Sequence, residues 1–197
     1  MIAVEQPHRR AIPPQMPDFS DPLVLLVQCH RKIEAHLKAL EKATDSLRNG
    51  TLEEKLSAFF AIDMARAHFA GPGVKHTEDE ELSLFPRLRE RGGEAVEEAL
   101  AAMRSLEVEH RTVERLEAEF DHLAARLPRD GSWEMKDIDR LDQLAAMLIM
   151  LYRPHIRIEN ELLFPVAARV LSAGDLQAIG SEMRARRRLM LHRLQAN

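Results

Sequence analysis

The chain has 197 residues, enough for one domain with a sizeable core, and its 45% hydrophobic and 30% charged residues are ordinary for a globular protein. A formal net charge of -4 argues against a nucleic-acid partner, and no apolar run approaches the roughly 20 residues that span a bilayer. The single cysteine, Cys29, excludes an internal disulfide and fits a reducing compartment. We therefore expect a cytoplasmic protein without nucleic-acid or membrane partners.

Residues 1–20 are rich in proline and lack the apolar stretch of a signal peptide, so they predict an extended N-terminal arm. The chain as a whole is dominated by Leu, Ala, Glu, Arg and Met, which favour helices over strands. We expect a single all-α domain over residues 21–197, with its core at 21–171.

Four long segments carry apolar residues at steps of three and four, the period of an amphipathic helix. The first helix is expected from about residue 21 to 48, and Asn49-Gly50 ends it. The second starts at a capping box, Thr51-Leu52-Glu53-Glu54, and extends toward Gly92-Gly93. Gly71-Pro72-Gly73 should kink or break this second helix.

The third helix is expected over about 94–127 and the fourth over about 133–171, with a loop between them. Asp175 is predicted to cap a short fifth helix that ends near residue 193. We interpret the basic run at 184–188 as a solvated face of this last helix. Four long helices with short connections favour an up-and-down four-helix bundle, to which a short C-terminal helix is added.

Histidines lie in the middle of the apolar stripes of these helices, where polar side chains are rare. His76 and His155 are each followed four residues later by a glutamate that is expected to point inward with them, because residues i and i+4 share one helical face. Six side chains are thereby predicted to point inward: His30, His76, Glu80, His110, His155 and Glu159.

A buried ionised carboxylate is costly unless it is paired or bound to a metal, and this chain predicts two of them beside histidines. A lone inward histidine is more often an ordinary core side chain. The occurrence of two such pairs of histidine and glutamate on two helices is what indicates a metal site. Divalent iron, manganese, zinc or cobalt suits imidazole and carboxylate ligands, whereas a set without cysteine disfavours copper(I) and iron–sulfur clusters.

These features repeat along the chain at a nearly constant spacing. His30 precedes His110 by 80 residues, and the His76/Glu80 pair precedes the His155/Glu159 pair by 79. Leu84-Phe85-Pro86 also recurs as Leu163-Phe164-Pro165, where each proline either bends its helix or begins a helix terminus. The sequence therefore predicts two similar helical hairpins with a pseudo-two-fold relation, whose half-sites face each other in a two-metal centre.

This pattern resembles the hemerythrin-like (HHE cation-binding) domains over about residues 21–171. The resemblance implies a four-helix bundle around a non-haem di-iron centre, in which His30 and His76 hold one iron and His110 and His155 the other. Glu80 and Glu159 would bridge the two iron ions together with an oxo, hydroxo or water ligand. Zinc or manganese would be the substitutes for iron.

The chain departs from the oxygen-carrying hemerythrins, which have histidine where this chain has Glu159 and a bridging aspartate on the last helix. Some relatives also carry a glutamate at the position of Thr77. The first departure disfavours simple reversible oxygen carriage, while open metal positions suit oxygen, peroxide or nitric oxide. Three functions stay open: binding or reacting with these ligands in a redox or iron response, an enzyme that consumes peroxide or oxidises iron, and a non-catalytic metal-storage or metal-sensing module that acts through a protein partner.

Several nearby side chains have two interpretations. Glu34 and Glu114 follow His30 and His110 by four residues, so they either orient imidazoles or pair with surface arginines. Tyr152, one turn before His155, packs in the core or donates to a bound oxygen species.

Other side chains carry plainer expectations. We interpret Glu81 as a solvated charge and Cys29 as a packing residue. The histidines outside the predicted centre are expected to be exposed or locally bonded: His8, His36, His68, His122 and His192. A ferritin-like centre is disfavoured because Glu107-x-x-His110 and Glu119-x-x-His122 fall on one predicted helix, whereas such a centre needs the motif on two separate helices.

Overall fold

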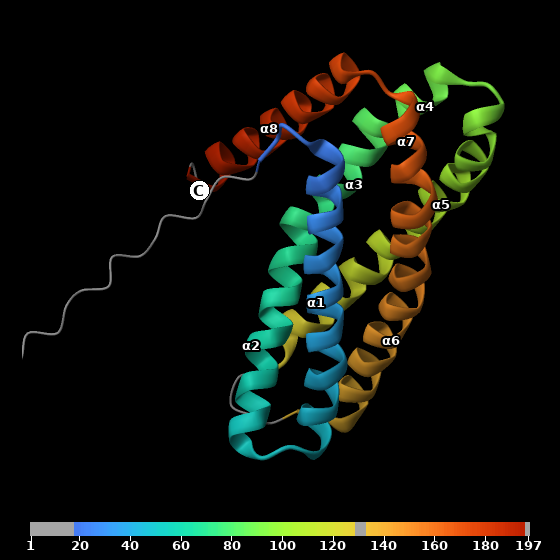
Figure 1. Cartoon of the computed structure of the whole chain (residues 1–197). Helices are drawn as coiled ribbons and strands as arrows, with labels where there is room; N and C mark the ends of the chain where they lie inside the picture. Colours follow the sequence, from blue (N-terminus) through green and yellow to red (C-terminus); the bar gives the residue numbers. More distant parts are fainter. Residues whose placement is uncertain (1–17, 129–132, 196–197) are drawn as a thin grey trace, which may run out of the picture.

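A computed structural model of the chain describes residues 18–128 and 133–195, with side chains as far as residue 188 (Figure 1). Most of the predicted N-terminal arm, residues 1–17, lies outside this part. The described residues form five continuous helical stretches and no strand, so the all-α prediction is confirmed. None of these helices combines the length and the apolarity that a membrane span requires.

The first stretch is α1 (Pro22–Asn49), which Asp21 caps by accepting a hydrogen bond from the Val24 N–H. The second stretch runs without interruption through α2 (Leu52–His68), η1 (Phe69–Gly73), α3 (Val74–Asp79), η2 (Glu80–Leu84) and α4 (Phe85–Arg91). The predicted capping box between Thr51 and Glu54 is present at its start. Gly92 and Gly93 end it in the left-handed region that glycine favours, with φ of 56° and 82°.

The helix does not break at Gly71-Pro72-Gly73, because the chain forms the π-helical turn η1 there instead. A π-helical turn is wider than an α-helical one and changes which carbonyl each N–H reaches, so it accommodates a proline without ending the helix. A π-helical turn also precedes Pro86 and Pro165, each time with one phenylalanine between the turn and the proline, and neither proline ends its helical stretch.

The third stretch is α5 (Glu94–Arg126), and the fourth joins α6 (Met135–Ile158), η3 (Glu159–Leu163) and α7 (Phe164–Val170). The last helix, α8 (Ala173–Gln195), was predicted to be short but has 23 residues. Its cap also differs from the prediction. Ser172 is the capping residue, since its hydroxyl accepts from the Asp175 N–H while the Asp175 carboxylate accepts from the Ser172 N–H.

The long helices lie side by side, with α1 in contact with both α2 and α6, and α5 in contact with the same two helices (Figure 1). α8 lies across one end of the molecule, where it contacts α1, α3 and η2. The core consists of two clusters of buried apolar side chains, each drawn from several helices. The first includes Ile33 and Ile156, and the second includes Phe19 and Met183. On each long helical stretch the predicted metal-binding residues lie between members of these two clusters.

Candidate metal centre

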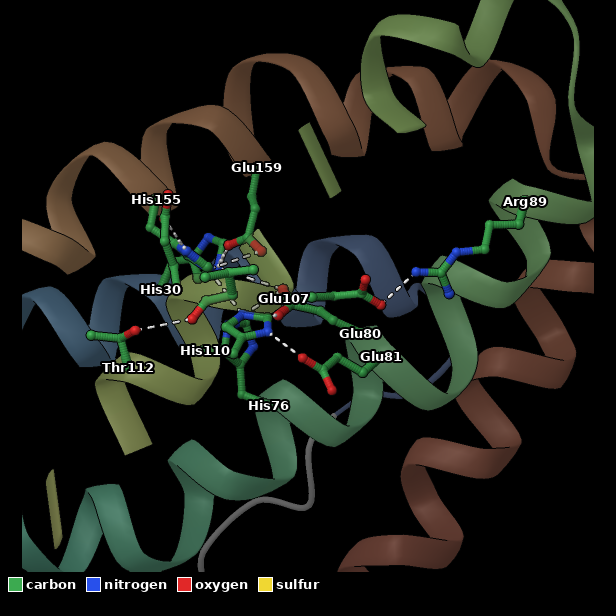
Figure 2. Close-up of polar contacts among 12 residues, drawn as sticks. His30, His76, Glu80, Glu81, Arg89, Glu107, His110, Thr112, His155 and Glu159 are labelled. Carbon is green, nitrogen blue, oxygen red and sulfur yellow. Dashed lines mark hydrogen bonds and ion pairs between the residues drawn. The ribbon is translucent and has the colours of Figure 1, made fainter. Parts of the chain in front are cut away.

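The six side chains predicted to point inward converge in the interior of the molecule, and all of them are buried (Figure 2). One histidine comes from each of α1, α3, α5 and α6. Glu80 is the first residue of η2 and Glu159 the first residue of η3, so each glutamate stands where its helix changes from α to π geometry. Such turns are frequent at functional sites, because they shift the direction of the side chains that follow.

The cluster divides into two half-sites, as the repeat predicts. In the first, one donor atom from each of His30, His76, Glu80 and Glu159 lies within 4.8 Å of all the others. In the second, the donor atoms of His110, His155 and Glu159 meet the same limit.

Both carboxylates stand between the half-sites. The two oxygens of Glu80 lie 3.4 Å from His76 Nε2 and 3.6 Å from His110 Nε2. Those of Glu159 lie 3.0 Å from His30 Nε2 and 3.2 Å from His155 Nε2. Neighbouring donors around an octahedral ion with bonds of ~2.1 Å are about 3 Å apart, so these separations fit a divalent cation.

The outer nitrogens of three imidazoles are held by acceptors on other helices. His30 Nδ1 lies 2.9 Å from the side-chain amide oxygen of Asn160, and His110 Nδ1 lies 2.8 Å from a Glu81 carboxylate oxygen. His155 Nδ1 lies 3.0 Å from Glu109. Because a carboxylate or carbonyl oxygen accepts, the ring hydrogen belongs on Nδ1 and the Nε2 lone pair points inward.

This arrangement leaves electron pairs facing one another without hydrogen. His110 Nε2 and His155 Nε2 are 2.9 Å apart, and in neutral imidazoles that donate from Nδ1 neither of these two atoms carries a hydrogen. Among the described residues, His30 Nε2 and all four oxygens of Glu80 and Glu159 have no hydrogen-bond partner. Cations bound in the two half-sites would satisfy these atoms, so the donor set fits a metal centre.

The electrostatics point the same way. Burial raises the pKa of Glu80 well above its usual range, and the charge of Glu159 raises it further. Burial would also raise the pKa of Glu159, but contacts with His155 and His30 hold it below its usual range. Two buried carboxylates that are both ionised would therefore repel each other and destabilise the protein, unless positive charge lies between them.

The residues that orient the imidazoles are not Glu34 and Glu114, the two candidates from the sequence. Glu34 and Glu114 are both exposed, and neither contacts an imidazole in the described structure. Glu81, expected to be solvated, instead binds His110, and this prediction is wrong. The partners in these contacts lie on different helical stretches, so spacing along one helix gives no signal for them.

A pocket of about 260 Å³ opens beside the second half-site and reaches three of the histidines. Its lining includes His76, His110, His155, Glu117 and Tyr152. The Tyr152 hydroxyl donates to Glu117 at 2.6 Å, and the ring is stacked against Phe69 in the core. Burial raises the pKa of Glu117 to about 7, so a proton remains available at this wall of the pocket near neutral pH.

The predictions for the histidines outside the centre and for Cys29 are confirmed in part. His122 is exposed and Cys29 is partly buried, as expected. His68 is buried, with its ring centroid 4.4 Å from that of His36, so of the two alternatives, exposure or a local bond, exposure does not hold for it. His8 and the side chain of His192 lie outside the described residues.

The basic run of α8 is only partly solvated. Arg186 and Arg187 each form an ion pair of 2.7 Å with Asp79, a fully buried carboxylate next to Glu80. Arg186 also donates to the Ser83 hydroxyl. The prediction of a solvated face is therefore wrong for these two arginines, which hold α8 against the helix that carries Glu80.

Comparison with known proteins agrees with the geometry. A protein of Haemophilus influenzae, described as uncharacterized, is 28% identical over 178 residues, which cover 90% of this chain and 96% of that protein. The family described as the Hemerythrin HHE cation binding domain matches residues 21–167, a range that contains all six clustered side chains. The chain thus belongs to the hemerythrin family and carries its HHE cation-binding domain.

Proposed function

We propose that this protein is a cytoplasmic non-haem di-iron protein, built as one domain on an up-and-down four-helix bundle with two pseudo-two-fold halves. His30 and His76 would bind one iron, His110 and His155 the other, and Glu80 and Glu159 would bridge them. The observation that carries the proposal is the position of the two carboxylates, each of which has one oxygen near each half-site. Iron suits this mixture of imidazole and carboxylate donors.

The physiological ligand in this proposal is a small molecule such as oxygen, peroxide or nitric oxide. The iron ions, when bound, would supply open coordination positions and the capacity to exchange electrons with such a ligand. The pocket of about 260 Å³ beside His76, His110 and His155 supports entry from this side. Glu81, Glu109 and Asn160 would hold the imidazoles in the orientation that binding requires.

One observation favours an enzymatic variant of this function, the reduction of peroxide. Cleavage of a peroxide bond requires protons at the departing oxygen, and Glu117 holds one near neutral pH in the wall of the pocket. Its bond from Tyr152 fixes the carboxyl group in place. In this variant Glu117 would be the proton donor, whereas a pure binding protein has no need of it.

Metal analysis tests the di-iron proposal. Protein purified from iron-supplied cells should contain two iron ions per chain, and His76→Ala and His155→Ala should each lose iron from one half-site. His122→Ala, which changes an exposed histidine, is the matched control and should keep both ions. The proposal fails if both inner variants retain two iron ions per chain, or if zinc alone fills the native protein.

A further inference from the structure

An apolar stripe runs along the outer face of α2, on the surface of the molecule. Its first four large side chains follow at steps of four residues and are well exposed: Leu52 (70%), Leu56 (55%), Phe60 (69%) and Met64 (46%). The same face continues through Ala67 of α2 and, beyond this helix, through Ala70 of η1 and Val74 of α3, which are also exposed. We call these seven residues the α2 stripe.

The α2 stripe is not part of the core of this molecule. α2 buries a different face, with Ala58, Ile62 and Ala65, against the rest of the protein. A helix on the surface of a globular protein usually carries polar residues on its solvent side. The other large exposed apolar side chains of the described residues are divided among α1, η2, α5 and α6, whereas this stripe is continuous.

The exposed area is large enough to mark an interaction site. The five large side chains of the α2 stripe leave on the order of 500 Å² of apolar surface in water on each molecule, near the upper range for monomeric proteins. If two molecules cover this surface mutually, the buried area is roughly 1,000 Å², which is the lower limit of a stable protein interface. Neighbouring residues at the rim of the contact would add to it.

We propose that the partner is a second copy of this chain, which packs its α2 stripe antiparallel against the first across a two-fold axis. The distribution of side-chain size along the stripe favours this arrangement. Its first half is bulky, with Leu52, Leu56 and Phe60, and its second half contains Ala67 and Ala70.

The antiparallel pairing places the bulky Leu56 and Phe60 opposite the small alanines. An axis near the midpoint of the stripe brings Leu56 of one molecule to Ala70 of the other and Phe60 to Ala67, with the two Met64 side chains beside the axis. Residues at steps of four form ridges that pack into the grooves of a second helix. Such a contact is closed by its own symmetry, because the same patch serves both molecules. A parallel pairing would place Phe60 against Phe60 and leave the alanines facing a gap.

Sedimentation equilibrium of the full iron-loaded chain tests the dimer. The wild-type protein should sediment as a dimer, and Phe60→Glu should sediment as a monomer while its iron content and helical circular dichroism stay those of the wild type. Met150→Glu adds the same charge to an apolar residue of α6 that is 67% exposed, and this control should remain a dimer. A wild-type monomer at every concentration overturns the proposal, and so does a Phe60→Glu protein that remains dimeric.

Disulfide cross-linking tests the orientation. In a Cys29→Ser background, Met64→Cys should form a cross-linked dimer with itself, because the two residues lie beside the axis. Leu52→Cys alone should not cross-link, but it should link to Val74→Cys when the two variants are mixed. Cross-linking of Leu52→Cys with itself, without linkage to Val74→Cys, would mean parallel pairing and would overturn the antiparallel arrangement.

Discussion

Removing both arginines that neutralise Asp79 should destabilise the protein strongly. The Asp79 carboxylate is fully buried. One of its oxygens accepts a hydrogen bond from Arg186, and the other forms an ion pair with Arg187, both at 2.7 Å. Burial raises the pKa of Asp79, and the two guanidinium groups oppose this effect. Breaking a buried ion pair by removing one partner costs about 3–5 kcal/mol, because the remaining charge is left without compensation. We expect this loss in the free energy of unfolding of the double variant Arg186→Met/Arg187→Met.

The magnitude needs little correction for solvent, since the two arginine side chains are only 16% and 18% exposed. Either single variant should lose about half as much, because the second guanidinium still faces Asp79. Arg188→Met, in the same basic run but exposed, is the matched control and should change stability by less than ~0.5 kcal/mol.

Urea denaturation followed by circular dichroism measures these differences, with and without iron, and the loss should appear in both conditions. Adding Asp79→Asn to the double variant should recover part of the stability, because it removes the uncompensated charge. An unchanged unfolding free energy in the double variant, or a further loss on adding Asp79→Asn, would refute the reasoning.

Three further predictions concern single side chains. Burial raises the pKa of Glu117 from 4.5 to about 7, so the folded chain keeps a proton that the unfolded chain releases as the pH rises through this window. Titration of Glu117 therefore lowers the free energy of unfolding as the pH rises from about 4.5 to 7. Between pH 5 and pH 8, Glu117→Gln should gain stability relative to the wild type, by about 3 kcal/mol at most. A difference between the two proteins that stays constant across this range would contradict the prediction. Glu81→Ala and Glu109→Ala should each weaken iron binding by roughly 10- to 100-fold in chelator competition, whereas exposed Glu34→Ala should bind as the wild type does. Thr51→Ala removes the hydroxyl that accepts from the Glu54 N–H and should cost about 1 kcal/mol in urea denaturation, and no loss would mean that the capping box contributes nothing.

The inward face of each helix could be predicted from the sequence because a helix fixes the direction of a side chain by its position. The stripes that contain His30 and His110 are buried as expected, and the 79-residue repeat related residues that lie on different helices. Helix ends with strong local signals, such as Asn49-Gly50 and Gly92-Gly93, were equally accessible.

What could not be predicted depends on contacts between distant parts of the chain. Asn160 reaches His30 across 130 residues, and Glu81 reaches His110 across 29, so no local pattern announces either contact. The partner of the basic run, Asp79, lies 107 residues before Arg186. The π-helical turns arise where prolines and the packing of the cluster alter an otherwise regular helix, and the period of apolar residues does not reveal them.

Anomalous diffraction at the iron edge from crystals of the iron-loaded protein tests the central claim most directly. The account predicts two peaks inside the cluster, one beside His30 and His76 and one beside His110 and His155, with the carboxylates of Glu80 and Glu159 between them. A single peak, or iron bound only outside these six side chains, would contradict it.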